Sequence, residues 1–380
     1  MKFNSDHFEV EKMKEERKRI LKMVEEGKLT VDEALTLLDE LEKDQKTMEQ
    51  KQEQILNELS TVVEFQESKK EDPFNAKLQS TKEKIFEFVD SALKKIKDMD
   101  FDLNFGHSID ISHIFQHGDA NVRDLDIDIA NGSVQLSAWD QPDVRVECQA
   151  KVYRVETQDQ ARENFLRDVV FSLESGRLRF VTQQKWMKVD AVIYLPKADF
   201  NKARIRLFNG SITGSGFHAN ELRVKTANGK INLEGINGKK AEIETANGKI
   251  SVTHSQFEQL EAETINGTII LEGDYQKTEA VSFNGSITAA LTGARSEWLH
   301  AKTTTGSLDL SIPEGITVKG ELKTNLGGFN LQLTGVQILE EKSEMIQKSL
   351  RFQSVDQPDV DLKVYADTKT GSVTLKKSLI

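Results

Sequence analysis

A motif built around Asn-Gly recurs five times at nearly constant spacing, and this period constrains the fold more than any other feature of the chain. Its glycines are 19, 19, 19 and 18 residues apart, and a related Thr-Gly motif follows at residues 304–308. A fixed period of about 20 residues indicates stacked repeats, because a unit of that size cannot bury an apolar face alone. The five pairs are Asn209-Gly210, Asn228-Gly229, Asn247-Gly248, Asn266-Gly267 and Asn284-Gly285.

Apolar and polar residues alternate on both sides of each Asn-Gly pair. In the third repeat, Ile243 lies five residues before Gly248. Ile250 and Val252 follow the same glycine by two and four residues, with Lys or Ser between them. Successive side chains of a strand point to opposite faces, so each repeat is predicted to contain two short, half-buried strands. Asn-Gly favours the positive φ of a tight turn between them.

Two folds satisfy this pattern. In a meander, each Asn-Gly pair closes a hairpin; in a β-solenoid, each 19-residue unit forms one coil. The near-identical sequences favour the solenoid, because stacking places equivalent residues side by side. Thr226, Thr245 and Thr264 would then form a ladder of β-branched residues. We therefore predict a mainly β protein, with a single-stranded β-solenoid over residues 201–335 preceded by an α-helical region.

The first 43 residues are predicted to form a helical hairpin. Ile20, Leu21 and Val24 recur at helical spacing, and Thr30 with Glu33 forms a capping box that opens the second helix. A unit this small has little stability alone and usually docks a partner or oligomerises, so residues 10–43 are expected to bind a protein. The second helix has an apolar stripe of Ala34, Leu35, Leu38 and Leu41.

Residues 44–72 are rich in Gln, Glu and Lys and are predicted to form a charged helical linker or a short coiled coil. Met48, Ile55, Leu59 and Val62 are spaced by seven, four and three residues, which keeps one narrow seam on a helix. A coiled coil here would make the protein a homo-oligomer, whereas a solvated linker helix would not.

Residues 73–100 are predicted to form an amphipathic helix edged with lysine. Such a helix can lie in a membrane interface, or it can cap the open end of a solenoid. The acidic residues mixed with the lysines favour capping or docking. The possible docking or membrane face consists of Leu78, Ile85, Phe86, Val89, Leu93 and Ile96.

The regions that flank the repeats also have strand patterns. Residues 101–200 are predicted to be a β lead-in with an inserted helix, in which residues 124–155 alternate as three strands. Thr157 and Gln160 open the helix. The sequence DQPDV occurs at residues 140–144 and again at 356–360, so residues 336–380 are predicted to be closing strands related to the lead-in.

Composition limits the class of protein. A net charge of −11 argues against binding to duplex DNA, because such proteins are usually basic, and we expect no nucleic acid partner. Cys148 is the single cysteine, so no disulfide framework or zinc cluster is expected. The sequence lacks a signal-peptide core and an apolar run long enough to cross a bilayer. A cytoplasmic location is the expectation, with peripheral membrane or cell-surface association as the alternative.

The chain resembles the YvlB/LiaX-type proteins of Gram-positive bacteria. The resemblance rests on EERKRILKMVEEGKLTVDEALTLLDEL near the start, on FVDSALKKIKDMDFDLNFG, on DIDIANGSVQLSAWDQPDVRVECQAKVYRV and on RLFNGSITGSG. The repeats alone are similar to adhesin-like β-solenoid domains. The resemblance implies a role in the response to cell-envelope stress, including attack by antimicrobial peptides, and contact with such a peptide or with a membrane surface. It implies no catalytic residues.

No constellation typical of catalysis stands out. β-Helix enzymes need clustered carboxylates or a calcium site, but the positions after the repeat glycines carry Ser, Lys or Thr. Glu234, Glu272 and Asp274 recur too sparsely to form a pair. His107, His113 and His117 lie close in sequence, but strand and turn would scatter their rings. We predict no metal and no cofactor, and we expect Trp139 and Trp186 to be packed aromatics.

Two functions remain in view. The first is a non-enzymatic binding or scaffold protein of the envelope-stress response, with the solenoid as a binding surface and the N-terminal helices as a docking module. The second is a cytosolic regulator whose helical hairpin binds a transcription or signalling partner. A carbohydrate-active enzyme is a more distant third.

Overall fold

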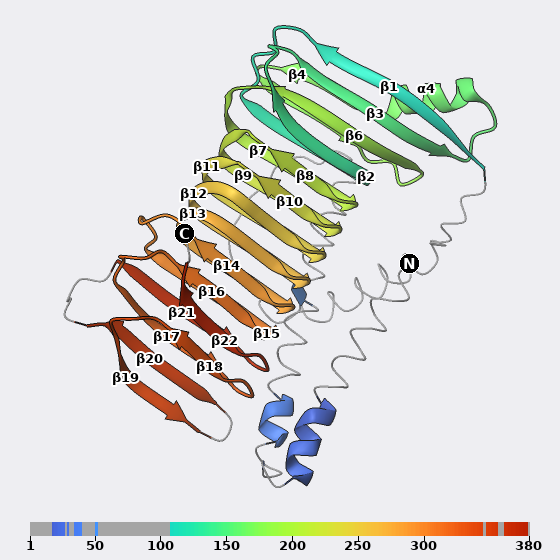
Figure 1. Ribbon diagram of the computed structural model, residues 1–380. Coiled ribbons are helices and arrows are strands. Elements are labelled where there is room, and N and C mark those ends of the chain that lie inside the picture. The colour runs from blue at the N-terminus through green and yellow to red at the C-terminus, as the bar shows by residue number, and fades with distance from the viewer. Residues whose placement is uncertain are drawn as a thin grey trace, which may run out of the picture.

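The computed structural model describes residues 17–26, 29, 34–39, 50–51, 107–344, 347–355 and 361–378. The predicted amphipathic helix (73–100) and its apolar face from Leu78 to Ile96 lie outside these residues, as does nearly all of the predicted linker. The described part is mainly β, with a small helical part near the N-terminus, and its strands form an elongated, solenoid-like stack (Figure 1).

Each central coil contains a long strand that ends at an Asn-Gly turn and a short strand that follows the turn. The long strands are β7 (Asp199–Asn209), β9 (His218–Asn228) and β11 (Asn237–Asn247). The short strands are β8 (Ile212–Ser215) and β10 (Ile231–Glu234). In the next coils the short and long parts run together, as β12 (Ile250–Asn266) and β13 (Ile269–Asn284).

Equivalent residues of successive coils pair with one another in parallel. Ile231 pairs with Ile212 on one side and with Ile250 on the other. Each isoleucine therefore pairs with its equivalents in neighbouring repeats and not with a residue across its own Asn-Gly turn. The alternative prediction of a meander of hairpins is wrong for this chain. The short strands β8 and β10 thus bond through the coil above and the coil below, as in a solenoid.

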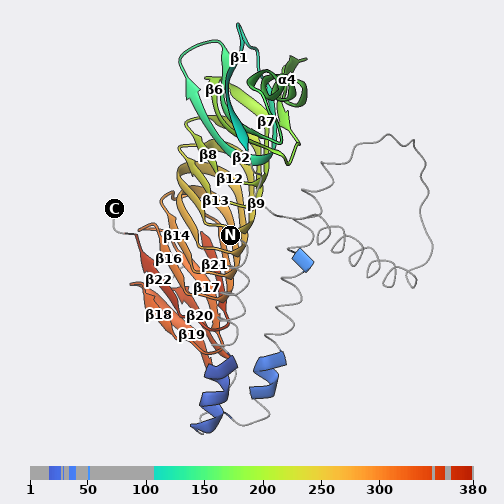
Figure 2. The same ribbon diagram turned by 90° about the vertical axis from the view of Figure 1, so that its right-hand side faces the viewer.

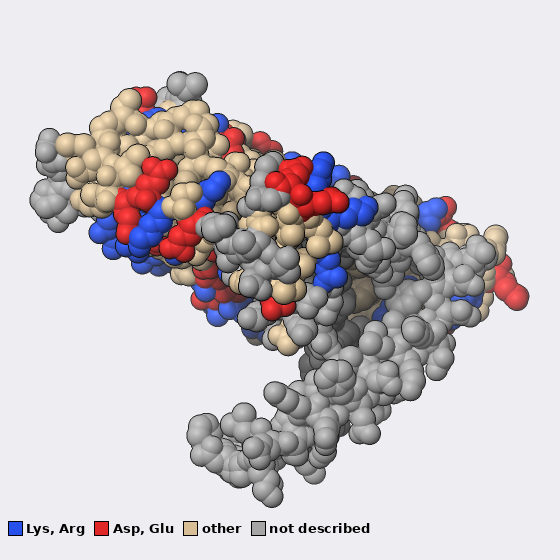
Figure 3. All heavy atoms as spheres, turned by 90° about the horizontal axis from the view of Figure 1, so that it is seen from below, with Lys and Arg blue, Asp and Glu red and all other residues tan. Residues whose placement is uncertain are grey.

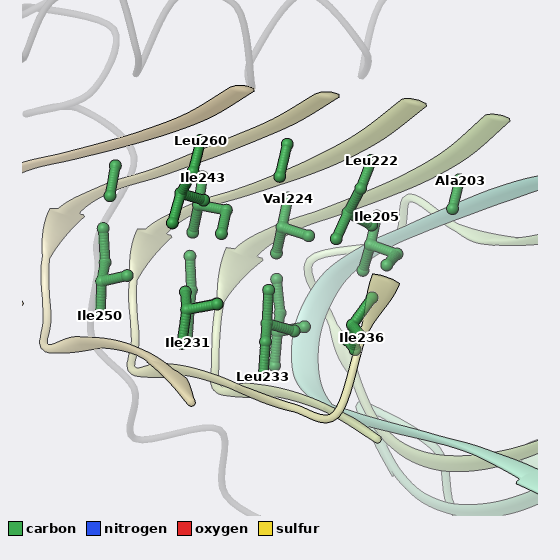
Figure 4. Packing of buried hydrophobic residues seen from close by; sticks show 14 of the residues in the cluster. Ala203, Ile205, Leu222, Val224, Ile231, Leu233, Ile236, Ile243, Ile250 and Leu260 are labelled. Atoms are coloured by element: carbon green, nitrogen blue, oxygen red, sulfur yellow. The ribbon is translucent and has the colours of Figure 1, made fainter. Parts of the chain in front are cut away.

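The interior of the stack is filled by rows of aliphatic side chains. Figure 4 shows Ile205, Val224 and Ile243 of the long strands facing a second row that contains Ile231 and Ile250 of the short strands. All five are buried. A fully buried side chain of this size contributes about 1.5–3 kcal/mol relative to an exposed one, so the rows supply much of the stabilisation.

The stack extends further toward the N-terminus than residue 201. β2 (Asp124–Trp139) pairs in parallel with β7 and β8, and β5 (Arg177–Thr182) and β6 (Met187–Pro196) pair in parallel with β2. β2 is one strand across its own Asn-Gly pair, so residues 124–155 form two strands and not the predicted three.

Antiparallel strands and a helix cover this end of the stack. β3 (Val144–Tyr153) pairs with β6, β1 (Ser108–His117) pairs with β3, and β4 (Val170–Glu174) pairs with β5. The helix α4 (Gln158–Asp168) begins at Thr157, whose hydroxyl accepts from the amide of Gln160, as the capping pattern predicts. Its Ala161 and Phe165 are buried. The end of the interior is thereby shielded from water.

The last coils depart from chain order. Their strands are β14 (Ile287–Leu291), β15 (Trp298–Thr305), β16 (Leu308–Ile312), β17 (Val318–Thr324), β18 (Phe329–Gln332), β19 (Val336–Ser343), β20 (Lys348–Ser354), β21 (Leu362–Thr368) and β22 (Val373–Lys377). β21 pairs in parallel with both β15 and β17, and β22 with both β16 and β18. The final two strands therefore lie one coil inside the stack, and the antiparallel pair β19–β20 lies beyond β17.

The helical residues near the N-terminus bury a small apolar cluster. It consists of Ile20, Leu29, Ala34 and Leu37. Leu21 and Leu35, which were expected on the apolar stripes, are 57% and 54% exposed. The buried helical face is the one that Leu326 of the β17–β18 connection packs against, and helical spacing alone does not reveal this contact. Figures 1 and 2 show these helices beside the end of the stack that carries β17 and β18.

Candidate functional site

The asparagines of the five turns form a hydrogen-bonded row along one edge of the stack. Nδ2 of Asn228 donates to Oδ1 of Asn209 at 2.8 Å. Equivalent bonds of 2.9 Å join Asn247, Asn266 and Asn284, each to the asparagine before it. Within the row each amide both donates and accepts, so neighbouring coils satisfy one another's polar groups.

The glycines of the turns are needed for a reason other than the predicted one. Of the five, Gly210 alone has a φ in the left-handed region, at 140°. The expectation of a positive φ is therefore wrong for the other four. A Cβ at Gly248 would lie 1.9 Å from the carbonyl oxygen of Gly229 in the neighbouring coil. The backbone of one turn passes so close to the next that no side chain fits between them.

Inward-pointing threonine hydroxyls form hydrogen bonds to the turns along the same edge. Oγ1 of Thr245 donates to the carbonyl oxygen of Gly229 at 3.1 Å, and Oγ1 of Thr264 donates to that of Gly248 at 3.1 Å. The side chains are buried. The predicted threonine ladder thus bonds the strand of one coil to the turn of its neighbour.

A shallow hollow of about 480 Å³ opens where the asparagine row ends. Thr305 occupies the asparagine position of the next coil, and its hydroxyl donates to Oδ1 of Asn284 at 2.7 Å. The hollow is lined by small residues, among them Thr268, Ser286 and Ser307. Its lining contains no charged side chain, so it can offer hydroxyls, backbone groups and the carboxamide of Asn284 to a ligand.

The outer face of the long strands carries charged residues in columns that change sign along the stack. Arg223 of β9 pairs with Arg204 on one side and with Glu242 of β11 on the other. Beyond this point the column continues with Glu261 and Glu279. Figure 3 shows the two signs interspersed over the side of the molecule that is seen from below.

Five carboxylates gather on three adjacent strands of that face. We call Glu242, Glu244, Glu261, Glu263 and Glu279 the acidic patch. Like charges directly opposite one another on neighbouring strands are destabilising, so the patch favours a cation from outside it. Arg223 and Lys225 of β9 lie 3.0 Å from Glu242 and 3.2 Å from Glu244. Lys240 of β11 lies 2.7 Å from Glu242 and 3.6 Å from Glu261, and the ring of His300 lies 3.3 Å from Glu279.

A further cation comes from the N-terminal part of the chain. Nζ of Lys51 forms an ion pair with Glu263. Partial burial lowers the pKa of Lys51, although Glu244 and Glu279 act in the opposite direction.

The acidic patch was not predicted, although the repeat sequence contains a signal for it. Counted from the glycine, the positions six and four residues earlier are Arg223 and Lys225 in one repeat, and Glu242 and Glu244 in the next. Both positions point outward in the predicted alternation. Aligning these two positions across the repeats locates the patch.

The cysteine, histidine and tryptophan side chains named above as candidates for chemistry are packed within the fold. Cys148 is buried, and burial raises the pKa of its thiol to about 12. The ring of His113 lies 5.7 Å from that of Phe165 in the end cover. Trp139 stacks on Tyr194, with ring centroids 5.1 Å apart. Among the described residues, no group of three or more His, Cys, Asp or Glu side chains is placed to hold a metal ion.

Of the residues proposed from the sequence, the five Asn-Gly pairs come together on one edge. The possible docking or membrane face from Leu78 to Ile96 lies outside the described residues. A search of the described helices for one long and apolar enough to span a bilayer finds none.

Comparison with known proteins places the chain in a family. The Toastrack DUF4097 family model matches residues 122–376, and a SHOCT-like domain model matches residues 15–46. The uncharacterized protein YvlB of Bacillus subtilis (strain 168) is 47% identical over 371 residues, which cover 96% of this chain and 100% of YvlB.

The solved structures that match the chain are distant from it in sequence. A candidate adhesin from Bacteroides fragilis NCTC 9343 is 12% identical, covers 70% of this chain and 97% of its own, and gives a TM-score of 0.35. A candidate lipid-binding protein from Parabacteroides distasonis ATCC 8503 is 9% identical with the same coverages and TM-score. The family match and the full-length similarity to YvlB show that the chain belongs to the Toastrack DUF4097 family.

Proposed function

We propose that this protein is a non-enzymatic binding protein of the cell-envelope stress response, in which the outer face of the stack binds a cationic peptide. The observation that carries the proposal is the acidic patch. Its carboxylates lie on rigid, parallel strands, and Glu242, Glu261 and Glu279 are in direct register. Single lysine and arginine side chains already pair with these carboxylates, so a ligand with several positive charges would bind by adding to or replacing these ion pairs, and an antimicrobial peptide has that chemistry.

The resemblance to YvlB/LiaX-type proteins supports the stress-response role. The SHOCT-like residues 15–46 would act as the docking module for a protein partner. A protein that couples a peptide-binding face to a docking module needs no catalytic group. This fits the structural roles of Cys148 and His113 described above.

Peptide binding to the full-length protein tests the proposal. In the variant Glu261→Gln/Glu263→Gln, the affinity for a labelled, lysine-rich amphipathic peptide is expected to fall about tenfold, equivalent to about 1.4 kcal/mol. The matched control is Glu156→Gln/Glu174→Gln, which removes two exposed carboxylates near α4 and β4 and should leave the affinity unchanged. Equal affinities for wild type and the patch variant would refute a peptide site on this face.

A second candidate function rests on the packing of the helical cluster. A cytosolic regulator could use residues 10–43 to bind a transcription or signalling partner, and Ile20 and Leu37 form the core of such a module. Fractionation of cells before and after exposure to a membrane-active peptide separates the two functions. The stress-response proposal requires the protein to be found with the envelope after exposure, whereas the regulator stays in the cytoplasm.

A further inference from the structure

The strand β1 is the outermost strand at the covered end of the stack (Figure 1). Among the described strands it pairs with β3 alone, in an antiparallel ladder that includes all ten of its residues without a register shift. The backbone groups on its other side are therefore not used by any described strand. An edge of this length is a template for a further strand, because the residues turned toward it offer N–H and C=O groups.

Two hydrogen bonds show which residues of β1 direct their backbone groups to this free side. The amide of Tyr153 in β3 donates to the carbonyl oxygen of Trp186, on the side of β6. Tyr153 thus faces away from Ser108, its partner in β1, and every second residue of an antiparallel pair repeats that orientation. The side chain of Gln158 agrees, because its Nε2 donates to the carbonyl oxygen of Asp110 at 3.1 Å. The residues that face the free side are Ser108, Asp110, Ser112, Ile114 and Gln116.

Gln158 limits how much of this edge another strand can use. It lies at the start of α4 and occupies the carbonyl oxygen of Asp110. The free-side backbone groups of Ser112, Ile114 and Gln116 are bonded to no described residue, and their side chains are exposed. Ile114, at the centre of the three, is 52% exposed. The usable edge is therefore a short segment with an apolar residue between two polar ones.

The residues that alternate with these three hold the strand in place. Ile111 is buried in the core. The ring of Phe115 lies 6.1 Å from that of Phe165 in α4 and 5.3 Å from that of Phe171 in β4. An anchored strand has little conformational freedom left to lose when a partner pairs with it, so the edge is preorganised for binding.

The other edge strands carry features that oppose pairing. Among the described strands β19 pairs with β20 alone, and its register shifts between Ile338 and Glu340. It also carries Glu341 and Lys342. β4 and β18 have five and four residues. Bulges, charges and short length are the usual means by which a sheet avoids association. β1 has none of these features, since it is regular, ten residues long, and carries Asp110 but no lysine or arginine.

We propose that β1 pairs antiparallel with β1 of a second copy of this protein, about a two-fold axis at Ile114. Ile114 then lies opposite its equivalent, and Ser112 lies opposite Gln116 in both directions, with a pair of backbone hydrogen bonds exchanged at each position. This register opposes no like charges. The segment offers no charge to select a different partner, whereas it matches itself. The acidic patch, on β11 to β13, stays free in such a dimer.

The oligomeric state of the full-length protein tests the proposal, measured by light scattering over a range of concentrations. The wild type should be a dimer that dissociates on dilution, because a single paired edge is a small interface. Ile114→Lys should raise the dimer dissociation constant at least about tenfold, since two lysines would meet at the axis. The control Leu166→Lys changes another exposed apolar residue at this end, on α4, and should leave the constant unchanged.

Two outcomes of this measurement would overturn the proposal. One is a wild-type protein that stays monomeric up to about 100 μM. The other is a dimer that Ile114→Lys does not weaken, as a coiled coil through residues 44–72 would give. The peptide titration of the acidic patch does not depend on either outcome.

The variant Ile114→Cys tests the position of the two-fold axis. Residues opposed in this way have Cα atoms about 5.5 Å apart, which is within the range of a disulfide. Mild oxidation should therefore give a covalent dimer, and Cys148 is buried and should not interfere. The control Val170→Cys, on the exposed edge strand β4, should stay monomeric. No covalent dimer from Ile114→Cys, or an equal yield from Val170→Cys, would contradict pairing through β1.

Discussion

The turns of the central coils keep both residues of the Asn-Gly pair, whereas the turns of the last coils keep only the glycine. From β7 to β13 every turn keeps both, and the asparagines bond in a row. In the last coils Thr305, Thr370 and Leu326 take the asparagine position, yet glycine follows at Gly306, Gly371 and Gly327. A Cβ at Gly371 would lie 1.9 Å from the carbonyl oxygen of Gly306. Close stacking of the turns thus requires glycine, whereas the position before it can be occupied by asparagine, threonine or leucine.

The central and last coils also differ in whether their order in space follows their order in the chain. The central coils stack in the order of the sequence, whereas β21 and β22 insert between earlier coils. Register is maintained there because Thr368 pairs with Thr303 on one side and with Thr324 on the other. Stacking depends on matched residues in neighbouring coils, and chain proximity is not needed.

A large effect, similar to that of truncating a core side chain, is expected from Gly248→Val. The new side chain would meet the backbone of Gly229, so the free energy of unfolding should fall by about 3 kcal/mol. Lys249→Val is the matched control, since its side chain is exposed and its cost should stay within about 0.5 kcal/mol. Thermal and denaturant unfolding measure both. Equal melting temperatures would contradict the close approach of the coils.

Truncation of the interior rows compares the two regions directly. Ile250→Ala in a central coil should cost about 2–5 kcal/mol, because its side chain is fully buried. Leu331→Ala in β18 should cost less, because that side chain is only partly buried. Denaturant unfolding of the two variants measures the difference. A larger loss of stability for Leu331→Ala would contradict the expectation that the central coils are packed more tightly than the last coils.

Substitutions at Asn247 ask how much the asparagine row contributes. Asn247→Ala removes hydrogen bonds on both sides and should cost about 1–3 kcal/mol. Asn247→Thr should cost less, because threonine occupies this position at Thr305 and Thr370. The free energies of unfolding of the two variants provide the test. If Asn247→Thr lowers the free energy of unfolding as much as Asn247→Ala, threonine does not replace the asparagine hydrogen bonds in the central coils.

The smallest effect is expected from Thr245→Val. The change keeps the shape and removes the bond from Oγ1 to the carbonyl oxygen of Gly229. A single neutral hydrogen bond contributes about 0.5–1.5 kcal/mol, so the melting temperature should fall slightly. A loss as large as that of Gly248→Val would mean that the threonines and not the glycines set the spacing of the coils.

The sequence predicts the central coils well because identical repeats place the same residue type in each row. Ile212, Ile231 and Ile250 follow from the period alone. The insertion of β21 could not be predicted, because a weakly matching motif at Gly371 does not specify which coils will accept it. The role of Leu326 against the helical cluster was also out of reach, since it joins segments about 300 residues apart in the chain. The acidic patch was not predicted because the outward positions before the glycine change charge between repeats, from Arg223 and Lys225 to Glu242 and Glu244, and so form no repeated motif.

A pair of alanine substitutions tests most directly whether coil contact, and not turn conformation, requires the glycines. Gly216 has a φ of +67° with nothing within 4 Å of an added Cβ, so alanine there meets strain alone, about 1–2 kcal/mol. Gly248 has no such φ, but its added Cβ would lie 1.9 Å from the oxygen of Gly229. We predict that Gly248→Ala lowers the free energy of unfolding more than Gly216→Ala. A larger loss for Gly216→Ala would contradict the account.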